Sequence, residues 1–522
     1  MPHSTRSICQ RTREWLADGD ARPFLTFVDQ RGSAHELSYG EFDKYARRIA
    51  ARLLELGCKR GDKVLFCRSH SVVLLASIAG CLLAGIVPVV FASPSQKFST
   101  ENYLEMIRTL SSQLQPDMAV IDDHVLKVVR DIFPFKLVGG SSFAPGYLRK
   151  ILGIRGAKFQ APKDSVALIQ YSSRTTGLKK GAVLTETALL DQVDNYAAAL
   201  NMSSDDRIAS WLPLYHDMGL VAGFVMPWIL GLPIVSMSPF DWLIRPEFFL
   251  KTVTASRSTL MWQPNFAFSH LARLFQGKDL SGIDLSSLRM VINCSEPITE
   301  SAHAAFLDVF AACGISDRQL ATCYAMAETT FAVTNSVANS TPVKKAVAPA
   351  SLGLGEAVRP GEMTLVSSGR AIPGTKVEIV DESGRPRETG IVGEIRIASE
   401  SMMSCYLGID PSETFTTERS YPTGDVGFLQ GGELFVLGRK DDTLIVRGQN
   451  VYPQSVEELV SLVSGVVPGR CVAFGSRLFS KDSEDLIILA ESRETDARQR
   501  STIAARITAS IAKVLDVPPR ES

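Results

Sequence analysis

The sequence has no closely spaced cysteines or histidines of the kind that hold a metal ion. Its nine cysteines stand far apart, at positions 9, 58, 67, 81, 294, 313, 323, 405 and 471, with no CxxC pair, and its seven histidines form no HExxH motif. This pattern argues against a structural zinc site. An odd, unpatterned set of cysteines in a long chain is typical of reduced thiols, so we expect a cytoplasmic protein.

A charge of one dominant sign is also lacking. The chain has 55 Lys and Arg against 56 Asp and Glu, a net charge of -1. It therefore has no overall positive field that would attract a nucleic acid, and we expect no nucleic-acid partner. The first residues, MPHSTRSICQRTREW, are interrupted by charge where a signal peptide has an apolar run.

Only one stretch, residues 72–91, is apolar enough to suggest a membrane span. It contains Gly80, Gly85 and Pro88 and reaches only the lower edge of the roughly 20 residues that a span requires. We interpret it as a buried helix over 72–84 followed by a buried strand over 87–91, and we expect no transmembrane segment.

The remaining sequence alternates between strand-like and helical patterns, which predicts an α/β fold with parallel sheets. The run 63–67 forms a βαβ unit with that helix and strand, and further strand-like runs cover 118–121, 166–171, 233–237 and 288–292. From about residue 365 the strand-like runs 376–380, 393–397 and 432–437 are separated by glycine turns, which predicts a small, antiparallel, barrel-like β subdomain. A charged linker, RKDD, begins at Arg439. We therefore expect a large N-terminal domain, 1–440, and a small α+β domain, 441–522.

Hydroxyl, glycine and lysine residues are concentrated in YSSRTTGLKKG, from Tyr171 to Gly181. A strand precedes this segment and helical spacing begins at Leu184, which predicts a strand–turn–helix unit. Hydroxyls and backbone N–H groups can bind phosphate oxygens, glycine allows close approach, and lysine offsets their charge. A solvated Ser/Thr turn is the alternative. The candidate phosphate ligands are Ser172, Ser173, Thr175, Thr176, Gly177 and Lys180.

Four more polar segments follow, and each has a structural alternative. In WLPLYHDMGL, His216 lies in an apolar context and could be a hydrogen-bonded core histidine. NCSEP, 293–297, ends a strand-like run, where open α/β sheets bind ligands. In YAMAETT, Tyr324 offers a stacking surface and Glu328 a carboxylate for Mg²⁺, or a helix N-terminal acid. In YPTGDVG, Asp425 could accept both hydroxyls of a ribose or form an ordinary turn.

Taken in order, these segments resemble the adenylate-forming superfamily of acyl-CoA synthetases, adenylation domains and luciferases. GRAIPG (369–374), VGEI (392–395) and LGRKDDTLIVRGQNVYP belong to the same series, and the resemblance covers about residues 10–515. The phrases PLYHDMGL, QPNFAF (263–268) and RGQNVYPQSVE (447–457) look most like the fatty acyl-AMP ligase branch. A long irregular stretch, 331–364, also resembles that branch.

The resemblance implies roles for the matching residues. His216, Glu328 and Arg439 would be catalytic, with Glu328 binding Mg²⁺, Arg439 reaching ribose or phosphate, and His216 between the acyl tunnel and the α-phosphate. Asp441 would be the hinge of a C-terminal lid. The residues that would bind ATP or AMP, besides the phosphate ligands and Arg439, are Asn293, Ser295, Glu296, Pro297, Tyr324, Ala325, Met326 and Asp425.

The implied reaction is attack of a fatty-acid carboxylate on the α-phosphate of ATP, giving acyl-adenylate and pyrophosphate. ATP and Mg²⁺ are the implied cofactors, and the acceptor is the phosphopantetheine thiol of an acyl carrier protein. Both reactants are anions, so catalysis would depend on charge neutralisation and positioning rather than on a general base.

Three features depart from the family pattern. Arg174 replaces the glycine of SSGTTG, and Ala325 replaces the glycine of YGMAE. Arg174 could block the phosphates or supply charge to them. The sequence also ends at VLDVPPRES without the SSGK-type lysine motif that the family carries next, and its last lysine, Lys513, lies in a helical pattern. Either the chain is a trimmed one or its apparatus for the first step is incomplete.

Alternatives to the ligase therefore stay open. The chain could be an acyl-CoA synthetase, or a catalytically impaired protein that binds a nucleotide or acyl-adenylate. An amino-acid-activating domain fits less well, because the nearest match to its FDxS-type aspartate, Asp241 in FDWL, lacks the serine.

Overall fold

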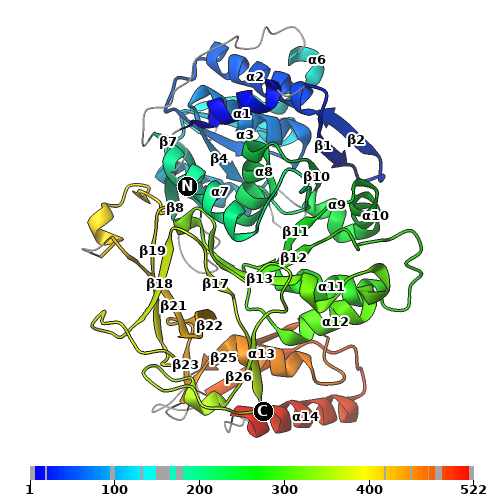
Figure 1. The fold of residues 1–522 in the computed structure, drawn as a ribbon, viewed down its shortest axis with the longest axis vertical. Coiled ribbons are helices and arrows are strands. Elements are labelled where there is room, and N and C mark those ends of the chain that lie inside the picture. The colour runs from blue at the N-terminus through cyan, green and yellow to red at the C-terminus, as the bar shows by residue number, and fades with distance from the viewer. Residues whose placement is uncertain are drawn as a thin grey trace.

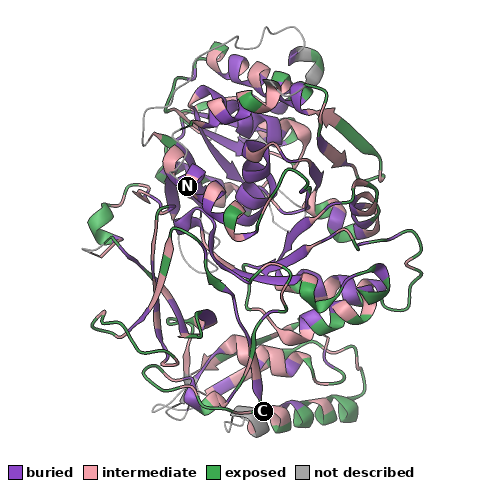
Figure 2. Ribbon diagram, in the orientation of Figure 1, coloured by how far each residue is buried: buried purple, intermediate pink, exposed green. Residues whose placement is uncertain are grey.

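The computed structural model describes residues 6–17, 20–93, 100–129, 133–148, 165–171, 180–416, 419–446, 449–467, 469–476 and 485–515 (Figure 1). It has the predicted α/β architecture, with a large part built on parallel sheets and a smaller C-terminal part. Most strands of the parallel sheets are buried, whereas much of the last helix, α14 (Ala497–Leu515), is exposed (Figure 2).

A nine-stranded sheet forms the centre of the large part, in the order β17-β14-β13-β12-β11-β9-β10-β1-β2. The strands from β13 to β1 run parallel, so the segments that follow β11, β12 and β13 meet at one edge of the sheet. The bounds are β1 (Pro23–Val28), β2 (Ala34–Ser38), β9 (Ile208–Ser210), β10 (Ile234–Met237), β11 (Leu260–Gln263), β12 (Met290–Cys294), β13 (Leu320–Ala325), β14 (Ala332–Asn335) and β17 (Arg370–Ala371).

A second, all-parallel sheet, β4-β3-β5-β6, contains the predicted βαβ unit. Helix α3 (Val72–Ala84) is buried from Leu74 onward and ends at Gly85, whose φ is 68°. A Cβ on Gly80 would lie 2.6 Å from the Ala46 carbonyl oxygen, so this glycine lets α3 pack on α2 (Tyr39–Glu55). No helix in the described ranges is long and apolar enough to cross a membrane. The strands are β3 (Lys63–Cys67), β4 (Val87–Phe91), β5 (Met118–Ile121) and β6 (Lys136–Gly139).

The predicted strand–turn–helix around the phosphate-loop-like segment is wrong. Residues Gly181–Thr185 form a strand, β8, that pairs antiparallel with β7 (Val166–Tyr171), and helix α7 (Glu186–Ala199) begins only afterwards. Thr185 caps α7 by accepting a 3.1 Å hydrogen bond from the Ala188 N–H. The segment between Tyr171 and Gly181 therefore connects two strands of a hairpin, and β20 (Cys405–Tyr406) pairs with the outer edge of β8.

Helices cover the sheets of the large part (Figure 1). Those not yet named are α1 (Ile8–Ala17), α4 (Thr100–Leu114), α5 (Asp123–Val129), α6 (Pro145–Leu148), α8 (Met226–Leu230), α9 (Pro239–Ile244), α10 (Pro246–Ser256), α11 (Asn265–Phe275) and α12 (Glu300–Phe310).

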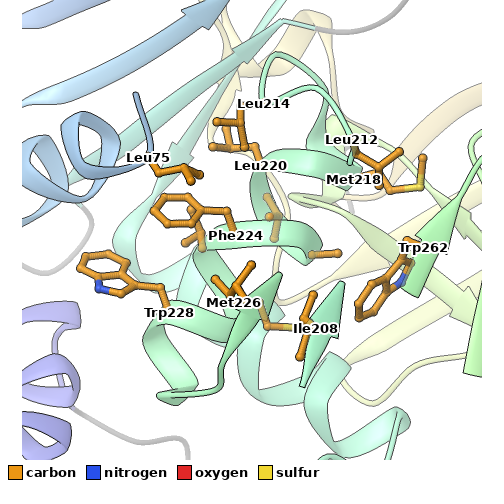
Figure 3. Packing of buried hydrophobic residues seen from close by; sticks show 14 of the residues in the cluster. Leu75, Ile208, Leu212, Leu214, Met218, Leu220, Phe224, Met226, Trp228 and Trp262 are labelled. Carbon is orange, nitrogen blue, oxygen red and sulfur yellow. The ribbon is translucent and has the colours of Figure 1, made fainter. Parts of the chain in front are cut away.

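A π-helix, η2 (Met218–Val225), follows the His216 segment and continues into α8. All of its residues are buried, and its side chains join an apolar interior with Leu75, Ile208 and Trp262 (Figure 3). A Cβ on Gly223 would lie 2.4 Å from the Ser210 Oγ, so the helix approaches β9 closely. π-Helical turns are uncommon and occur often at functional sites.

The β subdomain is a four-stranded antiparallel sheet in the order β18-β19-β21-β22. Its last strand, β22, also bonds to the segment just before β17, because the Ser368 N–H donates to the Leu434 carbonyl at 2.8 Å and the Leu434 N–H to the Gly369 carbonyl at 2.9 Å. Apolar clusters lie against it, one around Phe428 and Phe435 and one around Ile395 and Ile397. The strands are β18 (Thr375–Val380), β19 (Gly393–Ser399), β21 (Tyr421–Gln430) and β22 (Glu433–Arg439).

The stretch 331–364, predicted as irregular, is so only in part. It contains β14, the strand β15 (Lys344–Val347) and the start of β16 (Met363–Val366), and β15 pairs antiparallel with β16. Lys344 Nζ lies 2.8 Å from Glu300 Oε1 on α12, so this stretch contacts the large parallel-sheet part. It also reaches the C-terminal part, because the Tyr452 hydroxyl donates a 3.0 Å hydrogen bond to the Leu352 carbonyl.

The C-terminal part has an apolar core of its own, which includes Val456, Val460 and Ile511. Its helix α13 faces α12, and Ser301 Oγ lies 3.5 Å from Glu458 Oε1. Burial and the Glu300 carboxylate raise the pKa of Glu458 to about 7. The elements are β23 (Leu444–Val446), β24 (Gln449–Val451), α13 (Pro453–Ser461), β25 (Cys471–Ser476), β26 (Asp485–Ala490) and α14.

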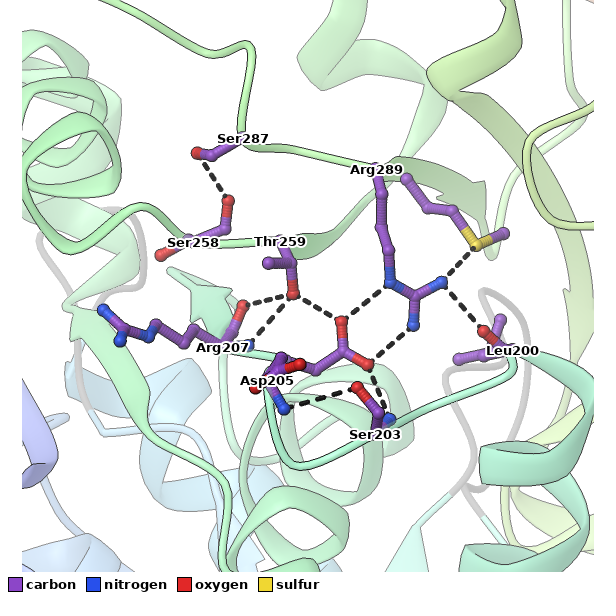
Figure 4. Close-up of polar contacts among 10 residues, drawn as sticks. Leu200, Ser203, Asp205, Arg207, Ser258, Thr259, Ser287 and Arg289 are labelled. Carbon is purple, nitrogen blue, oxygen red and sulfur yellow. Dashed lines mark hydrogen bonds and ion pairs between the residues drawn. The ribbon is translucent and has the colours of Figure 1, made fainter. Parts of the chain in front are cut away.

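A buried ion pair joins the start of β12 to the loop before β9 (Figure 4). Arg289 Nε and Nη2 donate to the two carboxylate oxygens of Asp206 at 2.7 and 2.8 Å, and Thr259 Oγ1 donates to the same carboxylate at 2.7 Å. Burial alone would raise the pKa of Asp206, but the hydrogen bonds, above all those from Arg289, lower it below its usual range.

Arg289→Ala is expected to destabilise the fold by about 3 kcal/mol, because it leaves a buried carboxylate without its cation. Urea unfolding followed by tryptophan fluorescence would measure the loss. The matched control is Arg245→Ala, which breaks an exposed 3.3 Å pair with Glu247 and should cost less than about 1 kcal/mol. If both substitutions lowered the free energy of unfolding equally, the Asp206–Arg289 pair would contribute no more stability than an exposed pair.

Candidate active site

The YAMAE and YPTGD segments lie side by side and make two contacts with each other. The Tyr324 hydroxyl, near the end of β13, donates to Asp425 Oδ2 on β21. The second contact joins Glu328, four residues after Tyr324, to Tyr421, four residues before Asp425: the Tyr421 hydroxyl lies 3.4 Å from Glu328 Oε1. The structure thus brings together two groups that the sequence separates by about a hundred residues.

Asp425 is buried and its carboxylate is oriented by several groups. Arg439, its register partner on β22, places Nε 3.4 Å from Oδ1. The Asp425 N–H donates to Thr423 Oγ1 at 3.0 Å, which fixes the backbone. Burial and the Asp425 carboxylate raise the pKa of the Tyr324 hydroxyl well above its usual value, so Tyr324 stays a donor. Three predicted site residues therefore form one connected group.

Glu328 lies in a short helical turn whose backbone is held in an unusual conformation. Thr330, two residues later, has φ 67° and ψ -45°, which is sterically costly for a β-branched residue. Its hydroxyl donates a 2.7 Å hydrogen bond to the Ser401 carbonyl, and the Met403 N–H donates to the Glu328 carbonyl at 2.8 Å. The segment that begins at Ser401 therefore holds the turn in place.

The Glu328 carboxylate is buried and accepts a hydrogen bond from the Tyr406 hydroxyl on Oε1. The Tyr406 and Tyr421 hydroxyls lie 2.8 Å apart, and Lys180 Nζ lies 5.0 Å from the centre of the Tyr406 ring. Lys180, a predicted phosphate ligand, thus lies over the ring of a tyrosine whose hydroxyl contacts Glu328. Sequence reasoning missed Tyr406 and Tyr421 as site residues; Tyr421 begins a recognised motif, but nothing around Tyr406 marks it.

The His216 segment lies beside the same carboxylate. Asp217 caps η2 by accepting a 2.8 Å hydrogen bond from the Met218 N–H. Burial and the negative charge of Glu328 raise the pKa of Asp217 to about 7. The His216 ring lies next to that of Tyr215, with centroids 4.8 Å apart. His216 therefore lies in the loop between β9 and η2, two residues before the buried π-helix begins.

Side chains of the 293–297 segment form hydrogen bonds with helices α11 and α12. Asn293 is fully buried, and its amide nitrogen is 2.9 Å from Asn265 Oδ1 and 3.0 Å from His303 Nε2. Glu296 Oε2 accepts a 2.8 Å hydrogen bond from the Phe266 N–H at the start of α11. Ser295 has φ 70°, and its Oγ lies 4.0 Å from Met218 Sδ, next to the His216 segment.

Other predicted site residues have simple surroundings. Pro297 is exposed, and Ala325 ends β13 opposite Ala332. The Met326 N–H donates to the Phe331 carbonyl at 2.8 Å. Asp441 is exposed between β22 and β23, directly after Lys440, whose N–H donates to the Gly424 carbonyl at 2.9 Å. Five phosphate-ligand candidates lie outside the described residues, as does Arg174: Ser172, Ser173, Thr175, Thr176 and Gly177.

Comparison with known proteins decides the family. A model of the family described as AMP-binding enzyme matches residues 13–407. The chain belongs to this AMP-binding enzyme family.

Individual relatives of this AMP-binding enzyme are fatty-acid ligases, which confirms the resemblance seen in the sequence. The medium-chain-fatty-acid–[acyl-carrier-protein] ligase JamA of Moorena producens is 30% identical over 466 residues, 84% of this chain and 77% of JamA. A structure from studies of fatty acyl-adenylate ligases of E. coli and L. pneumophila has 25% identity and a TM-score of 0.88, covering 99% of this chain and 93% of that one. The L. pneumophila ligase with acyl adenylate and pyrophosphate has 26% identity and a TM-score of 0.78, covering 99% and 92%.

The donor set of this AMP-binding enzyme fits Mg²⁺ held jointly with a nucleotide. Mg²⁺ commonly takes one or two protein carboxylates and completes its octahedron with phosphate oxygens and water. Within the described part of the chain there is no cluster of three or more acidic, histidine or cysteine side chains that would hold a metal alone. Glu328 is a buried carboxylate whose two hydroxyl contacts both fall on Oε1, and one of them comes from Tyr406, whose ring lies against Lys180.

Proposed function

We propose that this enzyme activates a medium- or long-chain fatty acid with ATP, forming an acyl-adenylate and releasing pyrophosphate. The acyl group would then pass to the phosphopantetheine thiol of an acyl carrier protein. The observation that carries the proposal is the double contact between the YAMAE and YPTGD segments beside Lys180. Similarity to fatty acyl-adenylate ligases along nearly the whole chain supports the substrate class.

On the nucleoside side, Asp425 would accept the ribose hydroxyls, with Arg439 beside it reaching ribose or phosphate. Tyr324 would stack on adenine, and Ser295, Glu296, Pro297, Ala325 and Met326 would border the base. Asn293 would act through its contacts with α11 and α12, because it is fully buried. Arg439 is partly exposed and contacts Asp425, which supports a place for both beside the same nucleoside.

On the phosphate side, Lys180 would offset the charge of the polyphosphate, the hydroxyls of Ser172, Ser173, Thr175 and Thr176 would donate hydrogen bonds to it, and Glu328 would hold Mg²⁺. When bound, this ion would offset charge on the phosphate oxygens. His216 would lie between the α-phosphate and the apolar interior around η2, in which the acyl chain would be bound. Asp441 would be the hinge between the domains 1–440 and 441–522.

The chemical step is a displacement at phosphorus. A carboxylate oxygen of the fatty acid forms a bond to the α-phosphorus, the bond from that phosphorus to the bridging oxygen breaks, and pyrophosphate leaves. The fatty-acid carboxylate is ionised at neutral pH. The protein's residues therefore need only orient the two anions, the fatty acid and ATP, and reduce their repulsion.

Purified protein with ATP and Mg²⁺ should release pyrophosphate only when a fatty acid is added, and mass spectrometry should detect the matching acyl-AMP. A series of saturated acids from six to eighteen carbons would define the chain length. ATP binding without fatty-acid-dependent pyrophosphate release would favour the non-catalytic alternative, and rapid formation of acyl-CoA from free coenzyme A would favour the acyl-CoA synthetase.

A further inference from the structure

Tyr406 has contacts on both its hydroxyl and its ring face that connect two parts of the site. Its hydroxyl donates to the Glu328 carboxylate and lies 2.8 Å from the Tyr421 hydroxyl. Its ring face lies 5.0 Å from Lys180 Nζ. The residue is buried, so neither contact is weakened much by water.

The strand that carries Tyr406 is attached to the phosphate hairpin. Tyr406 pairs with Ala182 in the register of β20 and β8. The Leu407 N–H donates to the Gly181 carbonyl at 2.8 Å, directly after Lys180, and the Ser404 N–H donates to the Val183 carbonyl at 2.9 Å. A displacement of the hairpin therefore displaces the Tyr406 backbone with it.

The same segment is attached to the Glu328 turn at two further points. The Met403 N–H contacts the Glu328 carbonyl, and the Ser401 carbonyl accepts from Thr330, the residue with the strained backbone. Residues 401–407 thus bind the hairpin on one side and the Glu328 turn on the other. Within this segment, the Tyr406 side chain contacts two charged groups: Lys180, next to the hairpin strand, and Glu328 in the turn.

We propose that Tyr406 is a positioning residue that couples the phosphate-binding Lys180 to the metal-binding carboxylate of Glu328. The inference depends on the proposed function and goes further by assigning a role to a residue outside the recognised motifs. The hydroxyl fixes the orientation of the carboxylate, because a buried carboxylate without a donor would be free to rotate or would seek another partner. The ring holds the Lys180 ammonium group on its face.

Two substitutions separate the two contacts. Tyr406→Phe removes the hydroxyl and keeps the ring, whereas Tyr406→Leu removes both. ATP binding is measured by calorimetry without fatty acid, so that no turnover occurs, once with EDTA and once with Mg²⁺. In Tyr406→Phe, the gain in ATP affinity that Mg²⁺ provides should fall about tenfold, as expected for loss of a hydrogen bond to a charged group, while metal-free ATP binding stays unchanged.

Tyr406→Leu should show the same loss of the Mg²⁺ gain and should also weaken metal-free ATP binding about threefold, through loss of the cation–π contact. The matched control is Tyr45→Phe, whose hydroxyl donates at 3.2 Å to the Phe143 carbonyl far from this group; it should change neither quantity. An unchanged Mg²⁺ gain in Tyr406→Phe would overturn the proposal, as would equal weakening of metal-free binding by Phe and Leu.

If Tyr406→Phe does not accumulate as folded protein, Tyr421→Phe gives the same test, because its hydroxyl contacts both Tyr406 and Glu328. A smaller loss of the Mg²⁺ gain is then expected, and an unchanged gain would contradict the proposal. Failure of the unaltered protein to bind ATP would instead overturn the proposed function, and the coupling with it, so the two failures are distinguishable.

Discussion

Glu328→Gln is expected to slow fatty-acid-dependent pyrophosphate release about 100-fold or more, equivalent to roughly 3 kcal/mol of activation free energy. Glutamine has the shape of glutamate, and its amide oxygen can still accept the Tyr406 hydroxyl. It lacks the charge that binds Mg²⁺, so the substitution tests the charge alone. Activity would be measured over a range of Mg²⁺ concentrations, with a thermal unfolding curve to show that the fold is retained.

The matched control for this substitution is Glu433→Gln. Glu433 is also a buried carboxylate that accepts a hydroxyl hydrogen bond, from Ser367 at 2.7 Å, but it lies at the other end of β22 from Arg439. Its replacement should affect stability more than turnover. Normal turnover by Glu328→Gln at low Mg²⁺ would remove Glu328 from the metal site, whatever the control shows.

The sequence predicted some elements well because their residues leave few alternatives. The strand 63–67, the helix 72–84 and the strand 87–91 have the predicted bounds, since a nearly continuous apolar run with a glycine at its helix end can be buried in only a few ways. Strand β8 was missed for the opposite reason. GAVLT is too short to show a period, and the leucines after it have helical spacing, so the helix was started two residues early.

The site shows the same limit at the level of side chains. The NCSEP motif predicts that Asn293 lies near the end of a strand. Only the packing of α11 and α12 determines that its side-chain amide points into the interface between these two helices. Tyr406 is 78 residues from Glu328 along the chain, and a hydrogen bond between them follows from the pairing of β20 with β8, which no local pattern indicates. The stretch 331–364 was taken as irregular because its strands are only four residues long, too short to show a period.

That stretch has consequences for the acyl acceptor. It is attached to the large part through Lys344 and Glu300, and to the C-terminal part through Leu352 and Tyr452. Rotation of the C-terminal part about Asp441 would have to break the Tyr452 contact and expose Val347 and Leu352, which pack beneath Tyr452 in one apolar cluster. If acyl transfer requires the C-terminal part to rotate about the proposed hinge, these contacts would oppose that rotation.

We expect the enzyme to transfer its acyl group to a holo acyl carrier protein about 100 times faster than to free coenzyme A at equal thiol concentration, a difference of roughly 2.7 kcal/mol in activation free energy. The carrier protein can gain binding energy from a protein surface to offset the cost of displacing the C-terminal part, whereas free coenzyme A cannot. Mass spectrometry of acyl-carrier protein and acyl-CoA, formed from the same acyl-AMP, would measure the ratio.

Loosening the attachment should shift this ratio toward coenzyme A. The variant Tyr452→Phe with Lys344→Ala removes one contact of the stretch with the C-terminal part and one with the large part, and it should raise acyl-CoA formation several-fold, by about the 1 kcal/mol that one hydrogen bond contributes. Lys376→Ala, a change at an exposed pair with Glu378, is the control and should leave the ratio unaltered. Efficient acyl-CoA synthesis by the unaltered enzyme would place it with the acyl-CoA synthetases. If the ratio favours the carrier protein but does not change in the double variant, the restraint on the C-terminal part has no effect on acceptor choice. Acceptor choice would then depend on the carrier's docking surface.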